Sequence, residues 1–234
     1  MILQVSSRSR HRPLWLVTWA CLVCAGQVRA DSAGFFPEEH AIYSVEFSRE
    51  VSDWRGNGMT IETRNNRLSL NYSEPISTHL QGGVRLGHET MTQSGNPLTE
   101  GFQPDGYFLG VMLTGQYYFR PSMLLDMSAA YTFNNVNDEQ TSQQIRLDWH
   151  ELGLEANLIY NYRSLTLLAG VGARVLDIDE IASGTVNSTR SFRQASTGTV
   201  HLGLSFQVDP TGRIGIDVMQ GARQSTGLVF ERRY

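Results

Sequence analysis

The chain has 234 residues, a formal net charge of −4 and 41% hydrophobic residues. Residues 1–30 contain four arginines and no acid, so the remainder carries a net charge of −8, and it contains no lysine. This balance excludes the basic surface of a nucleic-acid-binding protein. Both cysteines, Cys21 and Cys24, lie in the first 30 residues, so the remainder can form neither a disulfide nor a thiolate metal site.

The first 30 residues have the order of a secretory signal peptide. Arginines occupy residues 1–12, an apolar run "PLWLVTWACLVCAG" follows, and "VRA" precedes Asp31. We predict cleavage after Ala30, because the apolar run is too short to span a bilayer comfortably. A retained anchor and lipidation at Cys21 or Cys24 remain alternatives. We expect a periplasmic N-terminal segment over 31–40 and a single domain over 41–234.

The domain alternates apolar and polar residues with a period of two, which is typical of β-strands. No later segment approaches 18 continuous apolar residues, so no transmembrane helix is expected there. In chain order, the predicted strands are 41–51, 59–74, 79–92, 107–120, 123–134, 144–162, 164–178, 194–208, 211–220 and 225–234.

Two of these runs change phase. In 59–74 the alternation shifts near Asn65 and Asn66, and in 144–162 it shifts near His150 and Glu151. A β-bulge inserts one residue and moves the following side chains to the other face. We therefore expect a bulge or a protruding loop at the first position and a bulge at the second.

The connections alternate in length. "EPIS", "RPS", "NYRS" and "DPTG" are short turns, whereas "SDWRGNG", "QSGNPLTEGFQPDG", "NVNDEQTSQQ" and "DIDEIASGTVNSTRSFRQ" are longer polar segments. Short turns on one side and long loops on the other are typical of outer-membrane barrels. Aromatic residues also recur near the short turns, where an interfacial girdle would lie: Tyr117, Phe119, Tyr160, Tyr162, Phe206 and Tyr234.

We therefore predict an all-β fold, a closed antiparallel transmembrane up-and-down β-barrel of ten strands, with eight as the alternative. A water-soluble β-sandwich or lipocalin-like barrel with its apolar face inward is the competing interpretation. A barrel this small has a lumen filled by side chains, and buried charges there need partners. We expect an interior ion network made of Arg85, Glu89, Asp126, Glu155, Arg174, Arg213 and Asp217.

A second group of charges lies where strands 144–162 and 164–178 approach the long loops. Its members are Asp148, His150, Glu151, Asp177, Asp179 and Glu180. The Asp-x-His and Asp-x-Asp pairs look like those of the omptin proteases, in which acids and an Asp–His couple activate water. Their chain order is reversed, however, and although Asp148 and His150 share the inward parity, Asp177 and Asp179 share the outward parity of Val175. A solvated acidic rim is the favoured interpretation, and contact with divalent cations or lipopolysaccharide is another.

A third group contains His88, Glu89, His201 and Ser205, which could serve a barrel-type lipid A hydrolase. His201 and Ser205 are four residues apart on one predicted strand, about 13 Å at ~3.3 Å per residue. That separation is too long for a hydrogen bond, so ordinary lumen packing is favoured.

The last ten residues, "STGLVFERRY", place Leu228, Phe230 and Tyr234 on one parity. In this feature and in its strand pattern the chain resembles small bacterial outer-membrane β-barrel proteins, with Arg232 departing from the usual hydrophobic residue. The resemblance implies a Gram-negative outer-membrane location and an insertion signal at Leu228, Phe230 and Tyr234 that the barrel-insertion machinery reads. It also implies contact with outer-membrane lipid and lipopolysaccharide, and a monomer.

Fold alone does not determine function. We expect a non-enzymatic structural or binding protein without cofactor or metal, whose extracellular loops contact lipopolysaccharide, surface ligands or small solutes. Trp54, Phe102 and Phe192 are the loop aromatics expected to make such contacts. A membrane-embedded hydrolase and a narrow channel for small or hydrophobic solutes are the alternatives.

Overall fold

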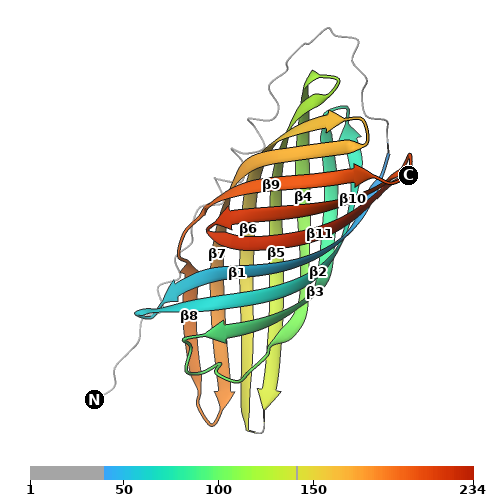
Figure 1. Ribbon diagram of the computed structural model, residues 1–234. Helices are drawn as coiled ribbons and strands as arrows, with labels where there is room; N and C mark the ends of the chain where they lie inside the picture. The colour runs from blue at the N-terminus through green and yellow to red at the C-terminus, as the bar shows by residue number, and fades with distance from the viewer. Residues whose placement is uncertain (1–39, 141) are drawn as a thin grey trace. The chain divides into compact units, whose positions relative to one another are not determined.

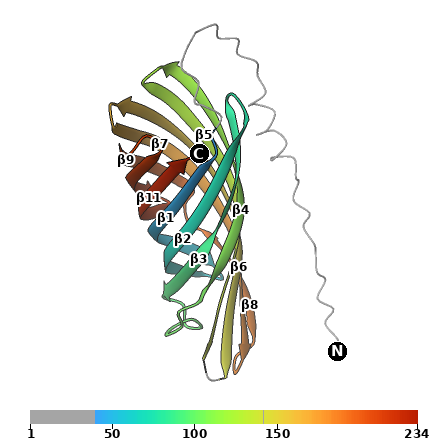
Figure 2. The same cartoon turned by 90° about the vertical axis from the view of Figure 1, so that its right-hand side faces the viewer.

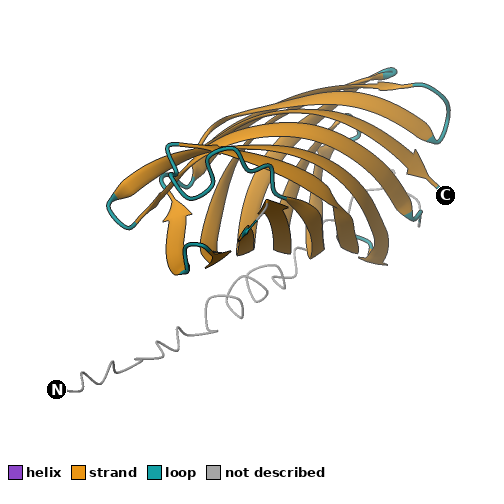
Figure 3. Ribbon diagram, turned by 90° about the horizontal axis from the view of Figure 1, so that it is seen from below, coloured by secondary structure: helices purple, strands orange, loops and turns teal. Residues whose placement is uncertain are grey.

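The computed structural model describes residues 40–140 and 142–234, so the predicted signal peptide and most of the predicted N-terminal segment lie outside the described residues. The described residues form strands, turns and loops (Figure 3), and none of them belongs to a helix that is long and apolar enough to cross a membrane. The strands are β1 (Ile42–Gly56), β2 (Met59–Ser77), β3 (Leu80–Ser94), β4 (Asp105–Arg120), β5 (Met123–Gln140), β6 (Gln143–Tyr162), β7 (Leu165–Gly184), β8 (Ser188–Gln194), β9 (Gly198–Gln207), β10 (Gly212–Gly221) and β11 (Arg223–Arg233).

Ten of these strands form a closed antiparallel ring (Figure 1). Neighbours in sequence pair along the wall from β1 to β7, and β9, β10 and β11 continue it. The ring closes because β1 pairs with β11 from Ile42 opposite Arg233 to Ser52 opposite Arg223. The predicted closed ten-stranded antiparallel barrel is confirmed.

The two ends of the barrel are distinct. Ala41 and Tyr234 exchange two backbone hydrogen bonds of 3.0 and 2.9 Å, which places the start and the end of the described wall together. The connections β2–β3, β4–β5, β6–β7 and β9–β10 turn at this same end, which we call the terminal end. The opposite end is called the distal end.

β8 was not predicted, and it changes the distal end of the wall. Residues 177–182 of β7 pair with β8 rather than β9, and β8 in turn pairs with Trp54 and Arg55 of β1. At this level β8 alone replaces β9, β10 and β11 between β7 and β1. Since barrel diameter grows with strand number, the distal end is narrower than the terminal end.

The long polar segments are mostly strand rather than loop, which corrects the sequence-based expectation. β5 and β6 continue to Gln140 and Gln143, and the β6 and β8 region projects past the neighbouring strands (Figure 2). β1 and β2 are joined by Asn57 and Gly58, whose φ values of 51° and 78° suit a tight hairpin turn. Only 95–104, between β3 and β4, is a long loop within the described residues.

Neither expected bulge is present. The pairing of β2 with β1 and β3 runs without a shift through Asn65 and Asn66. The pairing of β6 with β5 and β7 is equally regular through His150 and Glu151. The side chains keep alternating between the two faces, so the apparent phase changes have another cause.

That cause is an inversion of polarity along the wall. Near the terminal end the outward face is apolar and the inward face is polar, as the exposed Leu152 and Leu154 and the buried Asn157 on β6 show. Near the distal end the inward face is apolar, with Ile145 and Leu147 fully buried. The same strand therefore passes from an arrangement suited to lipid to one suited to water.

The outward apolar band differs in height around the barrel. On β6 it runs from Leu152 to Tyr162, a stretch of eleven residues. On β1 it contains only Tyr43, Val45 and Phe47 before the exposed Arg49. The adjacent β11 contributes Leu228 and Phe230, which lie between Thr226 and Arg232. The band is therefore tall on β6 and short at the β1–β11 seam.

Candidate functional site

An ion layer crosses the middle of the barrel. It is formed by inward-facing side chains of six strands: Glu50 of β1, Arg67 of β2, Glu89 of β3, Glu151 of β6, Arg174 of β7 and Arg223 of β11. Strand alternation alone sends each of these side chains to the interior, where charges require opposite charges nearby.

Arg67 and Arg174 connect the layer. The guanidinium of Arg67 lies 3.3 Å from the carboxylate of Glu89 and 3.4 Å from that of Glu151, and it donates to Asn134 at 2.7 Å. The guanidinium of Arg174 donates to Glu151 at 3.4 Å and forms an ion pair with Glu50. Glu151 thus bridges two arginines.

Arg223 completes the layer. Its guanidinium lies 3.4 Å from Glu50 and 3.5 Å from Glu155. Because Glu50 also binds Arg174, strands β1, β7 and β11 are linked across the interior. Each buried carboxylate of the layer faces at least one guanidinium, which is the condition for holding charge away from water.

An apolar core fills the distal half above the ion layer. Trp54 and Trp149 meet edge-to-face with ring centroids 5.7 Å apart, and Phe192 of β8 is buried beside them. The other buried members are Ile61, Met91, Val136, Ile145, Leu147, Leu176, Ile178 and Ala182. The ion layer and this core together occupy the interior across the narrow part of the barrel.

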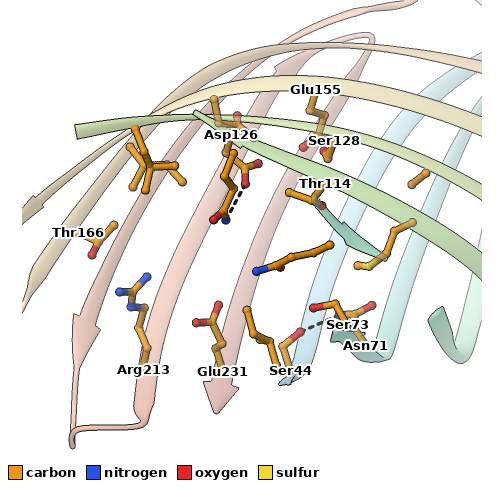
Figure 4. Close-up of a pocket in the computed structure, with 18 of the residues that line it drawn as sticks. Ser44, Asn71, Ser73, Thr114, Asp126, Ser128, Glu155, Thr166, Arg213 and Glu231 are labelled. Carbon is orange, nitrogen blue, oxygen red and sulfur yellow. Dashed lines mark hydrogen bonds between the residues drawn. The ribbon is translucent and has the colours of Figure 1, made fainter. Parts of the chain in front are cut away.

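A polar cavity of about 830 Å³ lies on the terminal side of the ion layer. Its lining runs from Glu151 and Arg174 in the ion layer to the terminal-end turn residues Arg163 and Pro210. Figure 4 shows side chains from facing walls pointing into it, among them Asp126, Glu155, Arg213 and Glu231. Hydroxyls and amides fill most of the remaining lining, including Ser44, Asn71, Ser73, Thr114, Gln116, Ser128 and Thr166.

The seven residues of the predicted ion network all occupy inward positions, but they do not pair with one another. Within the described part of the chain, Arg85 binds Glu46 at 3.3 Å, and Asp217 lies 3.6 Å from the ring of His201. Glu89, Glu155 and Arg174 find their partners among ion-layer residues outside the predicted set. Asp126 and Arg213 form no ion pair with any residue that the structure describes.

The predicted rim group is divided between the two faces. Asp148 and His150 point outward, contrary to their expected inward parity, whereas Glu151 belongs to the ion layer. Asp177 and Asp179 point outward as expected. Glu180 is buried and binds Arg190 at 2.8 Å.

On the outward face the rim residues are direct neighbours. Asp148 is opposite Asp179, and His150 is opposite Asp177. Among their further contacts are Arg146 with Asp148 at 2.9 Å, Arg193 with Asp177 at 3.2 Å, and Tyr131 with His150 at 2.6 Å. Within the described residues, no group of three or more His, Cys, Asp or Glu side chains is arranged to hold a metal.

The third predicted group is not assembled. His88 is on the outward face and lies 3.2 Å from Asp105, whereas Glu89 and His201 are inside. His201 instead contacts Asn157 at 3.2 Å, in agreement with ordinary lumen packing.

The three aromatic residues that we expected to contact ligands are not exposed on the loops. Trp54 and Phe192 are 1% and 2% exposed, and Phe102 packs against the same apolar core. They stabilise the distal half from within.

Sequence reasoning missed Glu50, Arg67 and Arg223 as interior charges. Glu50 and Arg67 have the inward parity of their predicted strands, so the alternation contained their signal, whereas Arg223 lies between two predicted strands and carried none. Their pairing depends on which residues face each other across the lumen, and that arrangement follows from the closure of the ring.

No protein-family model matches the chain, and no curated protein matches its sequence. Several solved structures do match its fold. The translocator domain of the autotransporter NalP from Neisseria meningitidis has a TM-score of 0.50 and 10% identity, over 94% of this chain and 95% of that one. The outer membrane protease OmpT from Escherichia coli has a TM-score of 0.53 and 8% identity, over 87% of this chain and 99% of that one. At these identities the likeness concerns the fold: the chain has the fold of an outer-membrane β-barrel.

Proposed function

We propose that the protein is a closed, non-conducting and non-enzymatic outer-membrane barrel whose function lies on its extracellular surface, beginning with contact to lipopolysaccharide. The terminal end, with short turns and both ends of the wall, faces the periplasm, as is usual for this architecture. The apolar outward band then spans the membrane, and the distal end projects outside.

The observation that carries this proposal is the sealed interior. The ion layer and the apolar core of Trp54, Trp149 and Phe192 lie one above the other across the barrel. A solute passing through the lumen from one end of the barrel to the other would have to disrupt both the ion layer and the apolar core. This favours a surface role over the channel alternative.

Lipopolysaccharide contact is supported by the charges just above the tall apolar band. Arg146 of β6 and Arg193 of β8 are both more than half exposed, with side-chain exposures of 54% and 63%. They point outward beyond the end of the apolar band, and in the proposed orientation the outer-leaflet headgroups would lie at this level. Arginine binds phosphate through two parallel hydrogen bonds, which suits the phosphates of lipid A.

Two measurements test the proposal. Single-channel recording in planar bilayers should show no conductance steps for the folded protein. Binding of purified lipopolysaccharide to the protein in phospholipid vesicles should weaken about tenfold in Arg146→Gln combined with Arg193→Gln, since each lost phosphate contact removes a charge-assisted hydrogen bond.

His150→Ala and Asp148→Asn are the matched controls. They alter the same outward face and leave both arginines in place, so lipopolysaccharide binding should persist. Regular conductance steps, or binding unaffected by the double arginine variant, would refute the proposal. Turnover of a peptide or lipid substrate that disappears in His150→Ala would instead favour the hydrolase alternative.

A further inference from the structure

Among the described residues that line the periplasm-facing cavity, one acid and one arginine point into its interior without an ion-pair partner. Asp126 projects from β5 and Arg213 from β10, and both point into the cavity (Figure 4). Among the described residues neither has an oppositely charged group within ion-pair distance, although most other charges lining the cavity do.

The nearest acid to Arg213 is already engaged. Glu231 is the cross-strand neighbour of Arg213 on β11. Two guanidinium nitrogens of Arg233 lie 3.2 Å from the same Glu231 carboxylate oxygen. Arg213 therefore shares this one acid with Arg233 and has no ion-pair contact of its own among the described residues.

Asp126 is in the converse position. Its neighbour Glu155 binds Arg223 at 3.5 Å, and no guanidinium reaches Asp126 itself. Its carboxylate accepts a hydrogen bond of 3.4 Å from Gln116 and interacts with Asn157, both neutral groups. These amides orient the carboxylate but do not balance its charge.

From these positions we infer that the cavity is a binding site for a small zwitterion. The ammonium group of the ligand would pair with Asp126, and its carboxylate or phosphate would pair with Arg213. The hydroxyl and amide groups of the lining supply further hydrogen bonds to the polar parts of such a ligand. The ion layer closes the cavity on its far side, so the ligand would enter and leave from the periplasm.

This site is independent of the proposed extracellular function. It lies on the other side of the ion layer, and it involves none of the outward charges. Loss of lipopolysaccharide binding and loss of zwitterion binding are therefore separate results.

The test is calorimetric titration of the folded protein in a nonionic detergent, which avoids competition from zwitterionic detergents. The probes are glycine, 4-aminobutyrate and 6-aminohexanoate, a series in which the two charges move apart. Butylamine and pentanoate carry one charge each. We expect at least one amino acid of the series to bind about tenfold or more tightly than either singly charged compound.

Asp126→Asn and Arg213→Gln separate the two charges. In Asp126→Asn the ammonium group has no partner, so the amino acid should bind no more tightly than pentanoate. In Arg213→Gln the carboxylate has no partner, so the amino acid should bind no more tightly than butylamine. Asp148→Asn and Arg146→Gln, on the outward face, are matched controls that should bind like the wild type. Heat-dependent migration on gels verifies that each variant is folded.

Two results would overturn the inference. One is the absence of binding for every zwitterion at millimolar concentration. The other is binding that is unchanged in both Asp126→Asn and Arg213→Gln, which would place the probe elsewhere on the protein or in the detergent.

Discussion

Trp149 and Leu152 lie three residues apart on β6 and point to opposite faces of an uninterrupted strand. Trp149 is 2% exposed inside the barrel, and Leu152 is 39% exposed outside it. Both side chains are apolar, although they lie on opposite faces of the wall. Each avoids water, because the apolar face of the wall switches from the outside to the inside between these two residues. Below this level the outside is suited to lipid; above it the inside is a packed core.

The first prediction concerns that core. Trp149→Ala should lower the free energy of unfolding by about 3–5 kcal/mol, because it leaves a large cavity between Trp54 and its neighbours. Urea-induced unfolding in phospholipid vesicles measures the change. His150→Ala, the adjacent outward residue, should cost far less. Equal losses for the two variants would contradict a packed distal interior.

The ten-stranded barrel could be predicted from the alternation and the turns, but the location of the water boundary could not. A period of two reports which residues share a face, and it does not report which solvent that face meets. The change from apolar odd to apolar even positions between Trp149 and Leu152 therefore predicts a bulge that β6 lacks. The same confusion assigned Asp148 and His150 to the inside. The polar sequence of β8, in a segment between two clear strands, predicts a loop, so the alternation alone does not reveal this strand.

The second prediction concerns the ion layer. Arg174→Ala should destabilise the protein by about 3–5 kcal/mol, since it leaves Glu50 and Glu151 buried with fewer partners. Arg146→Ala removes an exposed pair with Asp148 and should cost about 0–1 kcal/mol. Chemical denaturation of both variants under one condition gives the comparison. A loss for Arg174→Ala no larger than that for Arg146→Ala would show that the layer is solvated.

The third prediction concerns the β1–β11 seam. Thr226, opposite Arg49, and Arg232 are six residues apart on β11, about 20 Å at ~3.3 Å per residue. A typical hydrocarbon core is about 30 Å thick, so the bilayer should thin beside this seam. Fluorescent probes attached at Thr226→Cys and Arg232→Cys should be quenched weakly by brominated acyl chains, and one at Ala156→Cys on β6 strongly. Strong quenching at Thr226→Cys would indicate a bilayer of uniform thickness.

The fourth prediction concerns pH and the turn "DPTG" at the terminal end. Hydrogen bonds from Thr211 and Gly212 hold the pKa of Asp209 below its usual value. A lowered folded-state pKa stabilises the fold above the unfolded-state pKa, and this contribution disappears as the pH falls through the folded-state pKa. Asp209→Ala should therefore lower the melting temperature at neutral pH, with the difference from wild type shrinking in acid. A difference that is constant with pH would assign the effect to the turn geometry alone.

The most direct test of the account compares two outward positions on β6. Residues 31–234 contain no cysteine, so Arg146→Cys and Leu154→Cys each introduce a single thiol into that part of the chain. On intact cells, a membrane-impermeant maleimide should label Arg146→Cys in the outer-membrane fraction and leave Leu154→Cys unlabelled. Labelling of Leu154→Cys, or protection of Arg146→Cys, would contradict a barrel whose terminal half lies in lipid and whose distal half lies in water outside the cell.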